Sequence, residues 1–299
     1  MEKRQLGQTD MQVTVLGFGG AEIGFEGAAE ETVALLLNSA LDAGLNVIDT
    51  GECYEGSEEL IGKTASHRRD EYYLFTKCGH PRGVGTEDWS PASLLESIER
   101  SLRRLRTDHL DLIQLHTCSE SVLRKGDAIA ALRTAREKGH TRYIGYSGDS
   151  LAAKYAVECG AFDTLQTSIN IAEQEPLELT LPLAREREMG VIAKRPIANV
   201  AWKEQHKPID SYHHTYWQRL SKLKYEFIHQ LPLEESVARA LRFTLSVPGV
   251  HTAIVGTTKP ERWRQNAKMI EAGLLSEREF AAIQERWEEI APATWIGQT

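Results

Sequence analysis

Four residues with acid–base side chains lie at or near the ends of apolar, strand-like segments of the sequence: Asp49, Tyr54, Lys77 and His116. Tyrosine has a pKa of about 10, which makes it a poor acid at neutral pH. A neighbouring lysine ammonium favours the phenolate and lowers a tyrosine pKa by roughly 1–3 units, as opposite charges generally do. These residue types therefore suit a site in which a tyrosine gives up its proton.

Each side chain would have its own role in such a site. Asp49 would hold Lys77 in place and keep it charged, and His116 would hydrogen-bond a carbonyl oxygen and orient the substrate. The set suits protonation of a carbonyl oxygen while a hydride arrives at its carbon. Taken singly, each residue also has a structural alternative, as a turn former, a packed aromatic, a solvated charge or a loop histidine.

An alternation of strands and helices must position these residues. Amphipathic stretches predict helices at 31–43, 91–105, 122–138, 151–158, 177–188 and 217–230. Apolar runs predict strands at Val13–Phe18, Asn46–Ile48, Tyr72–Thr76, Leu110–Leu115, Arg142–Tyr146, Thr164–Thr167, Val191–Ala193 and Thr252–Val255. Eight strands in about 300 residues, with no dividing linker, favour a closed (β/α)8 TIM barrel of parallel strands with outer helices.

The active site of such a barrel lies at the carboxyl ends of its strands. Ser147, Gln166 and the segment 256–258 also stand at strand ends, so polar groups gather at one rim. Glycines between a helix-like stretch and a strand predict left-handed residues that end the helices, at Gly44, Gly139 and Gly190.

Composition and charge argue against several classes of protein, namely nucleic-acid-binding, membrane-spanning and secreted proteins. A net charge of -8 and a pI near 5.7 argue against general binding to nucleic acid or anionic membranes. No apolar run approaches the roughly 18 residues that span a bilayer, and the polar start of the chain does not resemble a signal peptide. The four cysteines lack CxxC spacing, which favours free thiols in a reducing compartment, so we expect a cytoplasmic protein.

Other nucleotide and metal motifs fail on inspection. The segment 17–20 resembles a dinucleotide-binding loop, but Glu22 stands where GxGxxG needs its third glycine. No GxxxxGK[ST] motif is present. His80 beside Cys78, and the pair His213 and His214, are too sparse for a zinc site, so no metal is expected.

We expect one domain over residues 1–299. A polar, aromatic-rich stretch at about 197–216 predicts a long loop after the seventh strand, and about 274–299 a C-terminal helix and tail. The aromatic residues of the long loop either fill loop cores or line an apolar substrate pocket, and the same choice applies to Ile23, Phe25, Trp89 and Trp295.

Seven segments, in order, carry a resemblance to a known family: LGFGG at 16–20, NVIDTGECYEGSEELIGK at 46–63, LFTK at 74–77, LDLIQLH at 110–116, IGYS at 144–147, LQTSIN at 165–170 and IVGTTKPERWRQNA at 254–267. Over nearly its whole length the chain resembles the aldo-keto reductases. The resemblance implies a (β/α)8 barrel that binds NADPH, with NADH as a further possibility, and reduces aldehydes or ketones. It also implies Tyr54 as proton donor, with Asp49 and Lys77 as its charge partners and His116 orienting the carbonyl.

The resemblance further implies a set of cofactor contacts: Gly20, Ala21, Ser147, Gln166, Lys194, Arg195, Gly256, Thr257, Thr258, Lys259, Arg262, Gln265 and Asn266. Gly148 replaces the asparagine that commonly follows the serine at 147, which weakens that contact or moves it to Asp149. Lys194 stands where many members carry an aromatic residue that stacks on the nicotinamide, and the planar guanidinium of Arg195 is a substitute. Arg262 is the partner expected for a 2′-phosphate, because it can bind it bidentately.

Two other functions remain open at this point. Some members of the family act as nucleotide-binding regulatory or redox-sensing subunits, and a sugar-modifying barrel enzyme would recycle its cofactor internally. The complete set of four acid–base residues favours an enzyme that acts on a small carbonyl or alcohol substrate. We expect a monomer or a small homo-oligomer.

Overall fold

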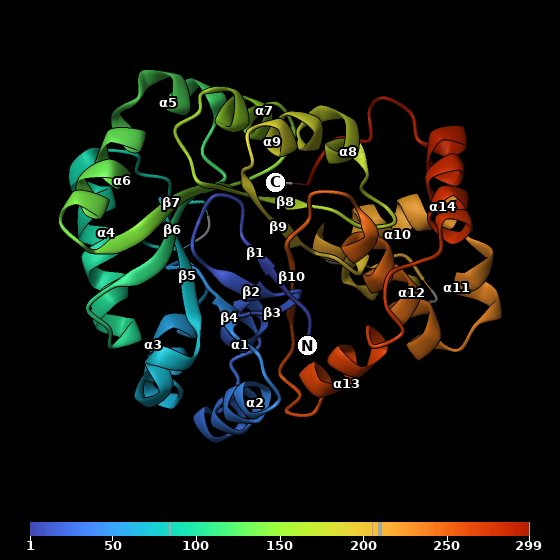
Figure 1. The fold of residues 1–299 in the computed structure, drawn as a ribbon, viewed down its shortest axis with the longest axis horizontal. Coiled ribbons are helices and arrows are strands. Elements are labelled where there is room, and N and C mark those ends of the chain that lie inside the picture. Colours follow the sequence, from blue (N-terminus) through green and yellow to red (C-terminus); the bar gives the residue numbers. More distant parts are fainter. Residues whose placement is uncertain (84, 205, 209–210, 299) are drawn as a thin grey trace.

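Eight parallel strands close into a barrel surrounded by helices, as the strand count predicts (Figure 1). This computed structural model describes residues 1–83, 85–204, 206–208 and 211–298. Around the barrel the strands follow the order β10, β3, β4, β5, β6, β7, β8 and β9. Their bounds are β3 Leu16–Gly19, β4 Val47–Asp49, β5 Tyr73–Cys78, β6 Leu110–His116, β7 Thr141–Ser147, β8 Thr164–Ser168, β9 Gly190–Lys194 and β10 Thr252–Gly256. The expected fold class is confirmed.

The first expected strand is divided. Lys3–Gln5 (β1) and Gln12–Thr14 (β2) form an antiparallel hairpin, and β3 of the barrel begins only at Leu16. Side chains of the hairpin pack with inward-facing residues of the barrel strands, among them Val47, Phe75 and Leu112. The hairpin therefore closes the amino-terminal end of the barrel, and its alternating pattern continues smoothly into β3, which explains why the two were not separable from sequence.

Helices on the amino-terminal side of the chain pack outside the barrel. They are α1 Ala21–Phe25, α2 Glu30–Asp42, α3 Ser57–Thr64, η1 Ser66–Glu71, α4 Pro91–Leu105, α5 Glu120–Lys125, α6 Asp127–Glu137 and α7 Ser150–Glu158. The helix expected over 122–138 is two helices, because Gly126 takes a left-handed conformation (φ 84°) between α5 and α6.

The remaining helices differ more from expectation. They are α8 Glu175–Leu179, α9 Leu181–Glu186, η2 Ala198–Lys203, α10 Ser211–Leu223, α11 Glu226–Gln230, α12 Leu233–Ser246, α13 Arg262–Met269 and α14 Glu277–Ile290. The helix expected over 177–188 is broken at Thr180, and the one over 217–230 at Lys224, whose φ is 46°. Part of the stretch expected to be a loop at 197–216 is helical, in η2 and in the start of α10.

Gly190 does not end a helix as expected. Gly44 and Gly139 take positive φ values of 92° and 76°, but near Gly190 the left-handed residue is Glu188, with φ 51°. Gly190 is instead the first residue of β9, and a Cβ there would lie 2.8 Å from Leu6 Cγ. The glycine is required by the close approach of the hairpin and not by a turn.

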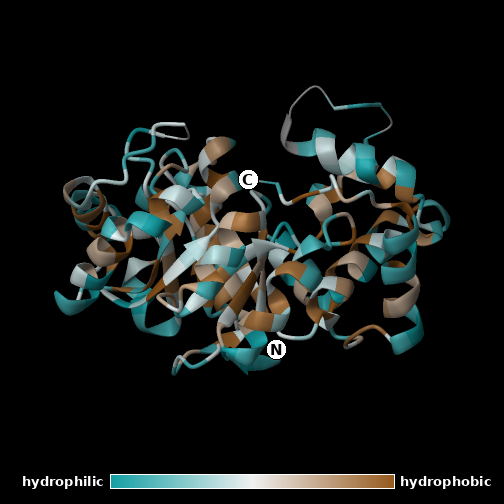
Figure 2. Ribbon diagram, turned by 90° about the horizontal axis from the view of Figure 1, so that it is seen from above, coloured by the Kyte–Doolittle hydropathy of each residue, from teal (hydrophilic) through white to brown (hydrophobic). Residues whose placement is uncertain are grey.

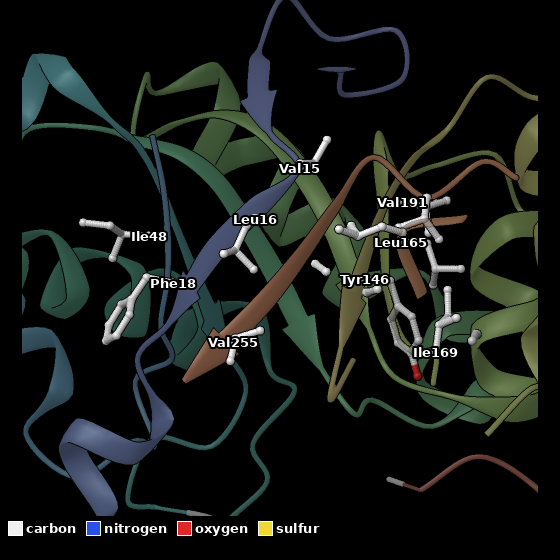
Figure 3. Close-up of a cluster of buried hydrophobic side chains, with 14 of the residues drawn as sticks. Val15, Leu16, Phe18, Ile48, Tyr146, Leu165, Ile169, Val191 and Val255 are labelled. Atoms are coloured by element: carbon white, nitrogen blue, oxygen red, sulfur yellow. The ribbon is translucent and has the colours of Figure 1, made fainter. Parts of the chain in front are cut away.

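The main core lies between the strands and the outer helices. Side chains from β3, β4, β7, β8, β9 and β10 form part of this layer (Figure 3). Viewed from above, apolar residues concentrate toward the interior and polar ones toward the outside (Figure 2). Over the described ranges, no helix combines the length and apolar character needed to cross a membrane.

Candidate active site

A buried ion pair joins the ends of two adjacent strands. Asp49 ends β4, and Lys77 lies near the end of β5. Lys77 Nζ lies 2.5 Å from Asp49 Oδ1 and donates to the Thr50 carbonyl at 2.6 Å. Both side chains are 1% exposed, so the lysine has its charge partner in a site nearly closed to water.

The second carboxylate oxygen of Asp49 is held from the opposite side of the barrel. Gln166 Nε2 donates to Asp49 Oδ2 at 2.8 Å, and Gln114 Nε2 at 3.3 Å. Ser147 Oγ donates to Gln166 Oε1 at 3.0 Å. Ser147 and Gln166, two of the predicted cofactor contacts, are thus linked by hydrogen bonds to Asp49 across the barrel.

Tyr54 lies above this network, in the loop between β4 and α3. Lys77 Nζ is 4.9 Å from the centre of its ring, and the His116 ring meets it edge-on with centroids 5.7 Å apart. The Phe25 ring lies 5.5 Å away on the other side. The structure therefore brings the four predicted acid–base residues together at the carboxyl ends of β4, β5 and β6.

His116 is held as a neutral imidazole. Its pKa is well below the usual value of 6.5, first because of burial and then because of the positive charges of Lys77 and Lys194, with smaller contributions from His80 and Arg195. A neutral imidazole has one N–H donor and one lone pair, so it can hydrogen-bond a carbonyl without competing with Tyr54 as an acid.

Aromatic rings continue along this rim. The His80 ring lies 5.3 Å from that of His116, and the Trp89 ring 5.7 Å from that of His80. Of the other residues expected to line an apolar pocket, Ile23 is fully buried in the core and Trp295 packs against Trp287. Phe25 therefore lies against Tyr54, whereas Trp89 is connected to His116 through the ring of His80.

Asp149 and Lys194 form a second buried ion pair, which the sequence did not reveal. Lys194 Nζ lies 2.9 Å from Asp149 Oδ2, while Oδ1 accepts from Thr167 Oγ1 and the Ser168 amide at 2.8 and 2.7 Å. Burial opposes the charge of Asp149, but Lys194 and the other donors outweigh it and its pKa is lowered. Asp149 is thus bound to Lys194 in this structure, and its role in place of the missing asparagine stays a prediction.

Gly148 has a packing reason. A Cβ at this position would lie 2.5 Å from the Tyr146 hydroxyl, which donates to the Cys118 carbonyl at 2.7 Å. Tyr146 is buried in the layer between strands and helices. An asparagine at 148 would displace that ring, so the departure from the family pattern follows from the tyrosine two residues earlier.

Arg195 contacts the C-terminal tail. Its φ is 54°, and its guanidinium donates to Ser168 Oγ at 3.1 Å and to the Gln298 carbonyl. The stacking role at the nicotinamide ring that the family resemblance suggests for this side chain stays a prediction, and in this structure its hydrogen bonds hold the tail.

The tail from Ile296 to Gln298 is fixed through its backbone. Glu173 accepts from the Gln298 amide at 2.8 Å, Arg219 donates to the Ile296 carbonyl at 2.6 Å, and Ser150 accepts from the Gly297 amide at 2.9 Å. Sequence analysis missed Glu173 and Arg219, because nothing in their local sequence marks them and only the fold brings them to the tail.

The buried carboxyl of Glu173 should make the stability of the folded protein depend on pH. Its pKa is raised to about 7, first by burial and then by Asp149. The folded protein therefore binds this proton more tightly than the unfolded chain does. The resulting stabilisation is complete below the ordinary glutamate pKa of 4.5 and is lost as the pH rises from there to about 7. We expect the free energy of unfolding to fall over this range in the wild type, relative to Glu173→Gln, as measured by urea unfolding. The exposed control Glu178→Gln should keep the wild-type profile, and a Glu173→Gln profile identical to wild type would contradict the assignment.

The loop after β10 contains four of the predicted cofactor contacts, Gly256 to Lys259. Its residues 256–259 lead into α13, which begins at Arg262. Lys259 donates its amide to Thr257 Oγ1 at 3.1 Å, and Thr258 Oγ1 donates to Glu26 at 2.8 Å. Of the predicted contacts on α13, Asn266 is buried and Gln265 is exposed.

A carboxylate also lies against this loop. A Cβ on Gly256 would lie 1.5 Å from Glu22 Oε2, so no other residue type has room at 256 while Glu22 keeps this position. The pKa of Glu22 is raised, chiefly by burial and with a contribution from Glu26, which favours its neutral form. Gly20 lies nearby, where a Cβ would come within 2.8 Å of Ser57 Oγ, and Ala21 begins α1.

No cluster of three or more metal-binding side chains is found in the part of the chain that the structure describes. The site thus consists of an acid–base centre, a polar strand-end network and a loop with a helix start at β10.

This arrangement is an acid–base site at the carboxyl ends of the strands of a parallel barrel, and comparison with known proteins identifies its family. Residues 15–288 match the model of the Aldo/keto reductase family, and the chain belongs to that family. The resemblance stated from the seven segments is confirmed.

Three similar proteins extend this result. The chain is 30% identical to an uncharacterized oxidoreductase YqkF of Bacillus subtilis, over 95% of this chain and 96% of that protein. The holo form of aldo-keto reductase AKR11C1 from Bacillus halodurans superposes with a TM-score of 0.83, at 28% identity and 96% coverage of both chains. An aldo/keto reductase from Klebsiella pneumoniae, solved with NADP and acetate, shares the fold with a TM-score of 0.75, at 23% identity over 98% of this chain and 96% of that one.

Proposed function

We propose that this aldo-keto reductase is an NADPH-dependent carbonyl reductase that converts an aldehyde or ketone to an alcohol. The observation that carries the proposal is the meeting of Tyr54, Lys77, Asp49 and His116 at one rim of the barrel. The NADP-bound relative from Klebsiella supports the choice of cofactor.

The donors present fit a dinucleotide phosphate. The loop from Gly256 to Lys259 and the start of α13 offer hydroxyls, amides, a lysine and an arginine, all of them donors to phosphate oxygens. Glu22 lies against the same loop, and its pKa is raised above the ordinary value of 4.5, chiefly by burial. When bound, NADPH would supply the hydride.

The residues of the chain would deliver a proton to the carbonyl oxygen of the substrate. Lys77 stabilises the developing phenolate of Tyr54 as the tyrosine hydroxyl gives its proton to the carbonyl oxygen. Asp49 keeps the lysine charged in a site with little water. Neutral His116 donates a hydrogen bond to the same oxygen and fixes its position. Phe25 and Trp89 give the rim an apolar character that suits a hydrophobic carbonyl compound.

Substrate-dependent oxidation of NADPH tests the function. A panel of aliphatic and aromatic aldehydes and ketones, assayed with NADPH and NADH, should give steady net cofactor oxidation. A nucleotide-sensing subunit would bind NADPH without turnover. A cofactor-recycling sugar enzyme would transform sugars without net NADPH consumption. Either outcome would overturn the proposal.

Arg262 tests the preference for the 2′-phosphate. Across the described residues, its side chain is not engaged in any ion pair, which leaves its charge available to a ligand. A charge-assisted hydrogen bond contributes roughly 1.5–3 kcal/mol, or about 10–150-fold in affinity. Arg262→Ala should therefore weaken NADPH binding by that factor and NADH binding little, as measured by fluorescence titration.

The exposed residue Arg264, two positions further along α13, provides a matched control. Arg264→Ala should leave both affinities near wild type. Equal weakening of NADPH and NADH in Arg262→Ala would reject the assignment to the 2′-phosphate.

A further inference from the structure

We propose that Cys53 is a positioning residue that determines which ring nitrogen of His116 carries the proton. Cys53 Sγ lies 3.4 Å from His116 Nδ1, within the range of a sulfur hydrogen bond. The inference rests on the proposed function for its catalytic consequence, although the proton position itself can be measured without turnover.

The thiol of Cys53 is the polar neighbour of the His116 ring among the residues that the structure describes. Cys53 is 3% exposed, and it immediately precedes Tyr54 in the loop between β4 and α3. The other neighbours of the imidazole are the rings of Tyr54 and His80, both packed edge-on. Among the residues that the structure describes, the contact with Cys53 is the only hydrogen bond recorded for the His116 ring.

The protonation states leave the thiol with a proton that it can donate to Nδ1. Burial raises the pKa of Cys53 to about 11, against a smaller lowering by Lys77 and further raising by Glu52 and Glu58, so the sulfur keeps its proton at neutral pH. The ring of His116 is neutral for the reasons given above. A thiol S–H that donates to Nδ1 requires this nitrogen to be the acceptor, and the ring proton then resides on Nε2.

This tautomer is the one that a carbonyl reductase needs if Nε2 faces the substrate. An Nε2–H group donates to the carbonyl oxygen, whereas the other tautomer presents a lone pair and repels that oxygen. One loop thus carries both the proton donor Tyr54 and the group that sets the orientation of the second donor.

The direct test is ¹⁵N NMR of histidine-labelled protein, with His116 assigned by comparison with His116→Gln. We expect the wild type to hold His116 as the Nε2–H tautomer at neutral pH, and Cys53→Ala to show an increased share of Nδ1–H. A wild-type ring protonated on Nδ1, or a tautomer ratio unchanged in Cys53→Ala, would overturn the inference. Because neither result requires activity, a failure of the proposed function is distinguishable from a failure of this inference.

A kinetic cycle tests the consequence for the reaction. A single neutral hydrogen bond is typically worth about 2- to 10-fold, so Cys53→Ala should lower kcat by that factor with little change in KM. In a His116→Gln background the same substitution should have no further effect, because Cys53 acts through the imidazole. An equal loss in both backgrounds would show a merely structural role. Cys53→Ser retains a donor and should recover part of the loss, and the distant Cys159→Ala should match wild type.

Discussion

A Tyr54→Phe variant is expected to lose about 10²–10⁴-fold in kcat for carbonyl reduction, the range attributed to general acid catalysis. Phenylalanine keeps the ring that packs against Phe25 and His116 and removes only the hydroxyl proton. NADPH affinity and the melting temperature should therefore remain near wild type. The loss should be concentrated in kcat, because the Tyr54 hydroxyl acts in the chemical step, when the carbonyl oxygen of the bound substrate is protonated.

Steady-state NADPH oxidation and fluorescence titration of the cofactor measure the two quantities. Tyr155→Phe, on α7 and beside Arg124, removes a hydroxyl away from the site and should be fully active. If Tyr54→Phe retained more than about a tenth of wild-type kcat, Tyr54 would not be the main proton donor.

Asp49→Asn is expected to combine a marked loss of kcat with a loss of stability. The carboxylate is the charge partner of Lys77 in a site where both side chains are 1% exposed. Removing one member of a buried ion pair typically costs about 3–5 kcal/mol, because the other charge is left without compensation. The support of Lys77 for the tyrosinate should weaken, and the pH–rate profile should differ from that of the wild type.

A role as a turn former would give a different result. Asparagine is a good turn residue and would preserve kcat and the pH profile. The structure argues against this alternative, because one carboxylate oxygen accepts from Lys77 on the adjacent strand and the other from Gln166 across the barrel. Denaturant unfolding and a pH–rate comparison decide the question at a temperature where circular dichroism shows the variant folded. The exposed control Asp127→Asn, at the start of α6, should match wild type in both measurements.

The sequence was sufficient to predict the barrel and the meeting of the acid–base residues. Apolar runs recur at regular intervals, and parallel strands bring the residues after each run to one rim. Local signals failed where a contact depended on distant residues. Gly190 fits its place because of Leu6, and the hairpin before β3 is indistinguishable from a longer strand until its pairing is known.

The polar residues beyond the centre were harder to predict for the same reason. Asp149 and Lys194 are 45 positions apart, and each alone has the character of a solvated charge, yet together they form a buried ion pair. All of the cofactor roles assigned from the family resemblance stay predictions, those of Ser147, Gln166, Lys194 and Arg195 included. Cys53 lies within the segment 46–63 that carries the family resemblance, but only the structure places its thiol beside His116.

The C-terminal tail is held through its main chain, so most of its side chains can be substituted without loss of these hydrogen bonds. Arg219, Ser150, Glu173 and Arg195 bind main-chain amides and carbonyls, which every residue type except proline provides in full. Ile296, more than half exposed, can therefore be exchanged freely in a mutant library. Gly297 is the exception, since a Cβ would lie 2.4 Å from that of Asp149. We therefore expect the tail to tolerate most substitutions except those at Gly297.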